Sequence, residues 1–282
     1  MKILITGGKG MLGRTLQREL VDFEIITADL PENDITDCVQ FEKLIQKEQP
    51  DAVIHCAAMT AVDKCETEVM RAYLLNESGS ENVAKACHKY GVRLIAISTD
   101  YVFSGDAAEP YSEYDSADGG KTVYGKSKFA GEEAIRRHCP DHVICRIAWL
   151  YGAGGPSFVH TMMNLADGSQ PELKIVADQF GNPTSCLAVA RKLHEILEYP
   201  QLKGVFHLTC EGEASWAEFA EEIFHLTGKK QKVVPCTSAE FPRPAPRPAN
   251  SRLLKLRLKE AGLPSMPHWK EALKEFVDSE FN

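Results

Sequence analysis

Short apolar runs alternate with longer amphipathic segments over the first half of the chain. The apolar runs, bounded by glycine or polar positions, predict β-strands at Lys2–Thr6, Glu24–Ala28, Ala52–Cys56, Arg93–Ile97 and Val143–Ile147. The amphipathic segments predict helices at Met11–Leu20, Val39–Glu48, Val69–Tyr90 and Val123–His138. Because parallel strands need long crossover connections, this alternation predicts an α/β fold with a doubly wound, Rossmann-type parallel sheet over residues 1–151.

The pattern becomes less regular after residue 151. Shorter apolar runs predict strands at Lys174–Val176, Val205–Leu208 and Lys232–Val234. Helical patterns occupy Leu187–Leu197, Trp216–Leu226, Ser251–Ala261 and Trp269–Phe281. We expect a smaller C-terminal α/β lobe over residues 152–282 that mainly binds substrate, with some segments returning to the first domain. The stretch Phe241–Asn250 holds four of the fifteen prolines and two arginines, a composition that fits either a flexible linker or a stiff loop at an active site.

Charge and cysteine usage narrow the class of protein. The 282 residues carry a formal net charge of −8, which argues against a nucleic-acid partner. Local arginines can still bind an anionic substrate. The nine cysteines show no C-x-x-C spacing, so neither a disulfide framework nor a zinc site is indicated. The N-terminus runs directly into an apolar strand without a signal-peptide or membrane-span pattern, and a cytoplasmic protein away from membranes is expected.

A glycine-rich turn follows the first predicted strand and opens the first predicted helix. Gly7, Gly10 and Gly13 recur at three-residue spacing around Met11 and Leu12. A dinucleotide pyrophosphate requires a tight turn, close approach of the backbone, and free N–H groups at a helix N-terminus. No G-K-[ST] follows the turn, which excludes a P-loop. The turn therefore predicts a site for a nicotinamide dinucleotide.

The second predicted strand ends at an acidic residue, Asp29. A carboxylate here commonly hydrogen-bonds the ribose hydroxyls of adenosine, which would favour NADH over NADPH. Asp29 could equally cap the following turn. Asp34, followed by Ile35, competes for the same adenosine contact, so the sequence leaves both cofactors open.

Tyr124 and Lys128 lie four residues apart on a predicted helix, and therefore on one face of it. Ser98 and Thr99 follow the fourth predicted strand, at the end of the sheet where ligands bind. Reduction of a carbonyl needs a hydride donor, an acid for the forming alkoxide and a hydrogen bond to the carbonyl. A neighbouring ammonium lowers the pKa of a tyrosine towards the working range. We therefore assign the acid to Tyr124, the ammonium to Lys128 and the hydrogen bond to Thr99.

These motifs resemble the extended short-chain dehydrogenase/reductases, and nearly end to end they resemble the dTDP-4-dehydrorhamnose reductase family within them. The segments that carry the resemblance are Thr6–Gly13, Cys56–Asp63, Ser98–Gly105, Val123–Glu132, Arg146–Gly152, Asp178–Thr184 and Arg247–Leu253. The resemblance implies an NADPH- or NADH-dependent oxidoreductase that acts on a dTDP-linked sugar in deoxysugar biosynthesis for cell-surface polysaccharide. It leaves open the exact nucleotide sugar, a homodimer and a divalent cation such as Mg²⁺.

The resemblance also implies roles for individual residues. The catalytic set is Thr99, Tyr124 and Lys128, of which Tyr124 and Lys128 also bind the cofactor. The nicotinamide side is lined by Ala57, Ala58 and Thr60. The sugar pocket is shaped by Val62, Thr99, Asp100, Tyr101 and Trp149, and the nucleotide diphosphate end by Arg247 and Asn250.

One departure and one rival function bear on these expectations. Gly154–Ser157 replaces an asparagine-containing stretch that the family pattern leads us to expect. The regulatory subunit of methionine adenosyltransferase, which is not catalytic, shares the fold and much of the motif set. A pure binding module gains little from a complete acid, lysine and hydroxyl set, so we favour the enzyme.

Overall fold

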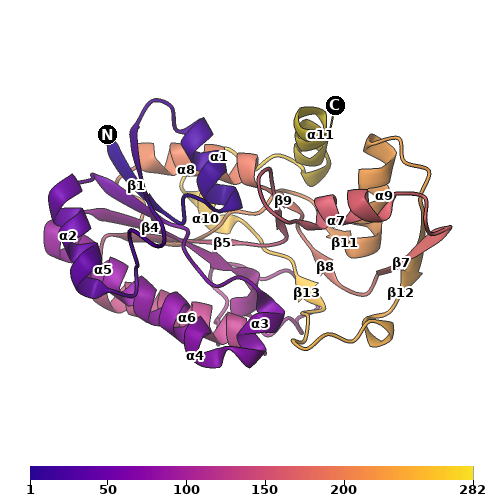
Figure 1. Cartoon of the computed structure of the whole chain (residues 1–282), viewed down its shortest axis with the longest axis horizontal. Helices are drawn as coiled ribbons and strands as arrows, with labels where there is room; N and C mark the ends of the chain where they lie inside the picture. The colour runs from indigo at the N-terminus through magenta and orange to yellow at the C-terminus, as the bar shows by residue number, and fades with distance from the viewer. Residues whose placement is uncertain (282) are drawn as a thin grey trace.

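The computed structural model describes residues 1–281, and its larger lobe is built on a six-stranded parallel sheet (Figure 1). The strand order is β2-β1-β3-β4-β5-β10. The strands are β1 (Lys2–Thr6), β2 (Glu24–Ala28), β3 (Ala52–His55), β4 (Arg93–Thr99), β5 (His142–Ile147) and β10 (Gly204–His207). The order reverses between β1 and β3, so the predicted doubly wound sheet is confirmed.

Helices cover both faces of this sheet, as the apolar character of its strands requires. One face is covered by α1 (Met11–Glu19) and α8 (Cys186–Glu198), and the other by α2 (Cys38–Glu48), α5 (Gly79–Tyr90) and α6 (Val123–His138). Successive residues of β1 point to opposite faces: Ile3 and Ile5 pack in the core beneath α1, whereas Leu4 packs in the core beneath α2. The side chains of Ile3, Leu4 and Ile5 are all fully buried.

The predicted helix over residues 69–90 is interrupted. It consists of α4 (Val69–Tyr73), a π-helical turn η1 (Leu74–Ser78) and α5. The buried side chain of Asn76, inside the π-turn, hydrogen-bonds the backbone of Met59 instead of facing solvent. Two short helices, α3 (Val62–Thr67) and α7 (Phe158–Leu165), were not predicted, because one or two turns carry little periodic signal.

The smaller lobe combines short strands with three helices. Strand β7 (Glu172–Val176) pairs with β12 (Lys232–Cys236), β8 (Phe180–Gly181) lies between β11 (Ala214–Ser215) and β13 (Asn250–Ser251), and β6 (Leu150–Tyr151) pairs with β9 (Thr184–Ser185). Its helices are α7, α9 (Trp216–Leu226) and α11 (Trp269–Glu280). Two short 3₁₀ helices complete the chain: η2 (Asp100–Val102) follows β4 of the large sheet, and η3 (Ser238–Glu240) follows β12.

The predicted helix over Ser251–Ala261 is wrong in its first half. Ser251 belongs to β13, and the helix there is the short α10 (Leu256–Glu260). Side-chain oxygens of Asn250 and Asn182 accept the backbone N–H groups of Arg252 and Leu253. These N–H groups are therefore taken by side chains, and the chain runs extended here.

The two lobes share an apolar core. The buried ring of Tyr151 contacts Phe219 of α9 and Phe276 of α11, with ring centroids 5.6 and 5.3 Å apart. The same core continues to Ile3 and Ile5 of the large sheet. The C-terminal half also supplies β10, which pairs in parallel with β5. The lobes are thus packed together, with the carboxyl ends of β1, β3, β4 and β5 facing the space between them.

Candidate active site

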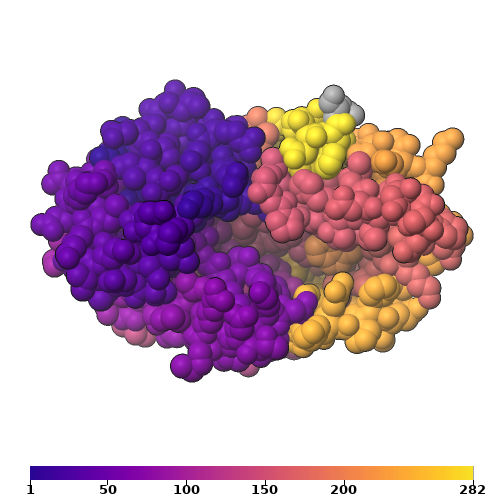
Figure 2. Space-filling model, viewed as in Figure 1, coloured from indigo at the N-terminus to yellow at the C-terminus, as the bar shows by residue number. Residues whose placement is uncertain are grey.

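A cavity of about 260 Å³ lies at the carboxyl ends of the central strands. Figure 2 shows the recess between the two lobes. Its walls combine the glycine turn, the ends of β3, β4 and β5, and one face of α6. The lining residues are Gly7, Gly10, Met11, Leu12, Gly13, Cys56, Ala57, Ala58, Thr60, Ile97, Ser98, Tyr124, Lys128, Ile147 and Leu150. Ten residues assigned to the cofactor from the sequence are therefore together in one cleft.

Two glycines of the turn, Gly7 and Gly13, leave no room for a Cβ. Gly7 has φ +72°, a left-handed conformation that glycine adopts at little cost. A Cβ on Gly13 would lie 2.2 Å from the Gly7 carbonyl oxygen, whereas a Cβ on Gly10 would lie 3.2 Å from it. The turn and the start of α1 thus present bare backbone to the cleft, which is the arrangement that a pyrophosphate fits.

The acidic residues assigned to adenosine lie outside this lining. Both carboxylate oxygens of Asp29 accept the Lys9 backbone N–H at 3.2 Å, so Asp29 braces the glycine turn. The Asp34 carboxylate accepts the N–H and hydroxyl of Thr36 at 2.8 Å each. Ile35 is buried in the core beneath α2. Contact of these residues with adenosine stays a prediction.

Thr99, Tyr124 and Lys128 meet at the end of β4. The Thr99 hydroxyl donates to the Asp100 carboxylate at 2.9 Å and accepts the Tyr101 backbone N–H at 3.2 Å. Burial raises the pKa of Tyr124, and a hydrogen bond with Thr99 opposes that rise. The lowering that we expected from the Lys128 ammonium is therefore not found in the structure. Tyr124 is therefore held in its protonated form at neutral pH, as a proton donor must be.

Lys128 is buried beside the cleft, with 7% of its surface exposed. Its Nζ donates to the Ile97 carbonyl at 2.8 Å, which anchors the ammonium to β4. Burial lowers its pKa to about 8, and the charge of Glu132 opposes this fall. The side chain therefore stays mostly protonated at neutral pH, close to the point at which it titrates.

Glu132, one turn after Lys128, organises a buried polar cluster that sequence reasoning did not assign. Its carboxylate accepts two hydrogen bonds from Arg146 at 2.9 and 2.7 Å, one from Arg136 at 2.7 Å and one from Ser98. Burial alone would raise the pKa of Glu132, but the bonds and charge of Arg146 outweigh it, and the pKa is lowered. The sequence did contain a sign of this contact, because Glu132 lies four residues after Lys128 and so on the same face of the helix.

Asn76 is a second residue that the sequence did not reveal. Its amide contacts both the N–H and the carbonyl of Met59, at 2.8 and 3.1 Å, and donates to Ser127 of α6 at 3.0 Å. It thereby joins the segment of Ala57, Ala58 and Thr60 to the helix that carries Tyr124. A lone asparagine in a helical pattern gives no sequence signal of such a role.

Of the residues assigned to the sugar pocket, Val62, Asp100 and Tyr101 lie beside Tyr124, whereas Trp149 packs against the core of the smaller lobe. Val62 and Tyr101 pack in one apolar cluster with Tyr124, and the two tyrosine rings meet edge to face at 5.4 Å. Burial raises the pKa of Asp100 to about 6. Trp149 adopts φ +48°, a strained value for a bulky residue, and stacks on Trp216 with centroids 3.5 Å apart. Trp216 was not assigned from the sequence.

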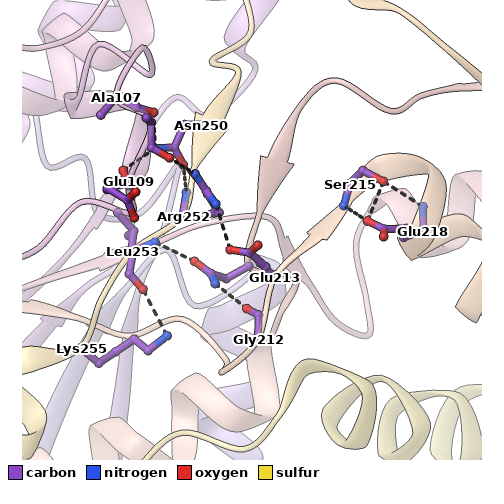
Figure 3. Close-up of polar contacts among 12 residues, drawn as sticks. Ala107, Glu109, Gly212, Glu213, Ser215, Glu218, Asn250, Arg252, Leu253 and Lys255 are labelled. Atoms are coloured by element: carbon purple, nitrogen blue, oxygen red, sulfur yellow. Dashed lines mark hydrogen bonds and ion pairs between the residues drawn. The ribbon is translucent and has the colours of Figure 1, made fainter.

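The two residues assigned to the diphosphate end differ in their partners. Arg247 forms an ion pair with Asp63 at 2.8 Å. Asn250 is 5% exposed and donates both amide hydrogens, to the carbonyls of Ala107 and Glu109, as Figure 3 shows. Its side chain therefore ties the lobes together, and a contact with nucleotide stays a prediction.

Two further findings concern metals and membranes. Within residues 1–281, no three His, Cys, Asp or Glu side chains are placed to hold a metal ion, and the Mg²⁺ that the sequence left open has no support there. No helix in that range is long and apolar enough to cross a bilayer.

Comparison with known proteins agrees with this geometry. The spore coat polysaccharide biosynthesis protein SpsK of Bacillus subtilis is 40% identical over 278 residues, covering 98% of this chain and 96% of SpsK. A crystal structure of a dTDP-4-dehydrorhamnose reductase from Clostridium acetobutylicum superposes with a TM-score of 0.95 at 45% identity, covering 99% of both chains. The dTDP-4-dehydrorhamnose reductase of Bacillus anthracis, in complex with NADP, gives a TM-score of 0.95 at 38% identity, again over 99% of both chains.

The family model described as the RmlD substrate binding domain matches residues 1–281. This match spans both lobes and every segment that forms the cleft. The chain therefore belongs to the RmlD family of the short-chain dehydrogenase/reductases.

Proposed function

We propose that this protein is an NADPH- or NADH-dependent reductase that converts the C4 ketone of dTDP-4-dehydro-L-rhamnose to the alcohol of dTDP-L-rhamnose. The observation that carries the proposal is the convergence of Thr99, Tyr124 and Lys128 beside a cleft whose far wall is the glycine turn. Relatives of nearly equal length that are named dTDP-4-dehydrorhamnose reductase support this choice of substrate. The reaction would serve deoxysugar biosynthesis for cell-surface polysaccharide.

The cleft fits a nicotinamide dinucleotide. Gly7, Gly10 and Gly13 offer a backbone cradle that a Cβ would fill, and Ala57 and Ala58 keep the opposite wall free of bulk. When bound, the reduced cofactor supplies a hydride to C4 of the sugar. Asp29 stands beside the glycine turn, where its charge would disfavour a 2′-phosphate.

The chain's own residues handle the proton and the carbonyl. Tyr124 gives its phenolic proton to O4 as the ketone becomes an alcohol, and the Lys128 ammonium stabilises the phenolate that remains. Lys128 has two further N–H groups besides the one bonded to Ile97, and these serve the nicotinamide ribose. The single hydroxyl proton of Thr99, which is donated to Asp100 in the structure, would turn to the carbonyl oxygen when substrate binds.

The remaining assigned residues bind the rest of the nucleotide sugar. Val62, Tyr101 and Trp149 form the apolar and aromatic part of the sugar pocket. Arg247 binds the diphosphate, because a planar guanidinium matches phosphate oxygens in bidentate geometry. An acidic protein can thus hold a doubly charged substrate through one local cation.

Turnover by the purified wild-type protein is the test. NADPH and dTDP-4-dehydrorhamnose are mixed, cofactor oxidation is followed by absorbance, and the product is identified by mass spectrometry. We expect dTDP-rhamnose. If the protein reduced only a different dTDP-linked 4-keto sugar, its assignment as a reductase would stand and the proposed substrate would be wrong. If the protein bound NADPH but reduced no such sugar, the assignment as an enzyme would be refuted and a regulatory binding module would be favoured.

A further inference from the structure

Asp63 holds the proline-rich segment 241–250, here called the strap, against the larger lobe. Its Oδ1 accepts the Ala245 backbone N–H at 3.1 Å, and its Oδ2 accepts Arg247 Nη2 at 2.8 Å. Arg247 Nη1 in turn donates to the Ala245 carbonyl at 2.9 Å. Asp63, Ala245 and Arg247 thus form a closed ring of hydrogen bonds between α3 and the strap.

The strap is firmly seated on both sides of this ring. Ala245 is fully buried although its neighbours Pro244 and Pro246 are exposed. Pro248 packs so closely on Gly105 that a Cβ there would lie 2.3 Å from it. Figure 1 shows the strap passing beside α3 before it enters β13. Prolines at alternate positions restrict the backbone, so the strap behaves as a stiff loop and not as the flexible linker that its composition also allowed.

The ring also fixes where the Arg247 charge lies. Burial raises the pKa of Tyr101, Asp100 adds to the rise, and the charge of Arg247 opposes it. The ion-pair partner of Arg247 is Asp63, which follows Val62. Val62 packs in one cluster with Tyr101 and Tyr124, so the ion pair stands at the edge of this cluster. A guanidinium has five N–H donors, and the ring of hydrogen bonds with Asp63 and Ala245 uses two of them. The remaining donors can bind the diphosphate of a ligand whose sugar lies beside Tyr101 and Tyr124.

We propose that Asp63 is a positioning residue for the nucleotide sugar, which fixes the strap and aims Arg247 at the diphosphate. The inference rests on the proposed function, since it takes a nucleotide diphosphate as the ligand. Asp63 cannot turn aside for an incoming phosphate without also losing its bond to the Ala245 N–H. The carboxylate therefore holds the guanidinium in one orientation before substrate binds, and phosphate does not simply displace it.

The test compares Asp63→Asn, Arg247→Ala and the double variant. Asparagine keeps an oxygen for the Ala245 N–H but removes the charge that orients Arg247. Binding of dTDP and of NADPH is measured by calorimetry, and kcat and KM with dTDP-4-dehydrorhamnose. Arg243→Ala, which removes an exposed guanidinium from the same strap, is the matched control.

We expect Asp63→Asn to raise the Kd for dTDP and the KM about tenfold, the scale of coupling within one hydrogen-bonded network. The kcat and the Kd for NADPH should stay within about twofold, a split that a general loss of structure would not give. In the Arg247→Ala background the same change should add less than about twofold. The Arg243→Ala control should bind dTDP nearly as wild type does.

Three outcomes would overturn this role. Unchanged or tighter dTDP binding by Asp63→Asn would show that the carboxylate does not position Arg247. A full tenfold effect in the Arg247→Ala background would show that Asp63 acts by another route. A wild-type protein that binds NADPH but no dTDP would refute the nucleotide assignment itself, and this result is distinguishable because it appears before any variant is made.

Discussion

Replacing Lys128 by methionine should make the ligand-free protein more stable while it abolishes catalysis. The pKa of Lys128 falls from the ordinary 10.5 to about 8, mainly through burial. Each pKa unit corresponds to about 1.4 kcal/mol, so holding the charged form in the folded protein costs about 3 kcal/mol below pH 8. Methionine loses the hydrogen bond to the Ile97 carbonyl, worth about 1 kcal/mol. A net gain of about 2 kcal/mol is expected at pH 7.

The sign of the pH dependence follows from the same pKa values. Between pH 8 and 10.5 the unfolded chain binds more protons at Lys128 than the folded chain does, so the contribution of Lys128 to the stability of the wild type rises with pH over this range. The advantage of Lys128→Met should therefore be full below pH 8 and should disappear as pH approaches 10.5. Comparing variant and wild type at each pH cancels the other titrating groups.

Urea unfolding followed by circular dichroism, without cofactor and at pH 7 and 10, measures the difference. Lys128→Arg is the control, because it keeps a buried charge that titrates far above this range. A Lys128→Met protein that is less stable than wild type at pH 7, or whose advantage does not shrink at pH 10, would refute the reasoning. Activity should fall at least about a hundredfold.

Three other changes probe the remaining parts of the site. Tyr124→Phe should lower single-turnover reduction about 10²–10⁴-fold with little change in the Kd for NADPH; turnover within about threefold of wild type would exclude Tyr124 as the acid. Gly13→Ala places a Cβ 2.2 Å from the Gly7 carbonyl oxygen and should abolish NADPH binding in calorimetry, whereas Gly10→Ala, at 3.2 Å, should weaken it only moderately. Asp29→Ala should shift the ratio of kcat/KM values towards NADPH, a role that is lost if the wild type already prefers NADPH to NADH.

The sheet could be predicted because its inner strands, β1, β3, β4 and β5, are buried on both faces and form continuous apolar runs in the sequence. The run from Lys2 to Thr6 is an example, and its predicted bounds are those of β1. The glycine turn was equally readable, since the steric demand that selects glycine acts over only a few residues. Tyr124 and Lys128 could be paired because helical spacing places both on one face.

The parts of the site that the sequence did not predict depend on contacts between residues far apart in the chain. Asn76 lies in the π-helical turn that interrupts a helix, and its amide bonds the backbone of Met59, seventeen residues earlier. Asp63 and Arg247 are 184 residues apart and meet only after the lobes have packed. Neither pairing leaves a periodic signal, so the polar supports of the site emerged only with the structure.

The pairing of β10 with β5 bears on how this gene can change over time. Strand β5 would become an exposed edge in a protein cut at residue 151, and an unpaired parallel edge invites aggregation. Recombination at that boundary would leave five strands of the sheet in one product and β10 alone in the other. We therefore expect new substrate preferences in this lineage to arise through point substitutions and loop changes, and not through exchange of a detachable C-terminal unit.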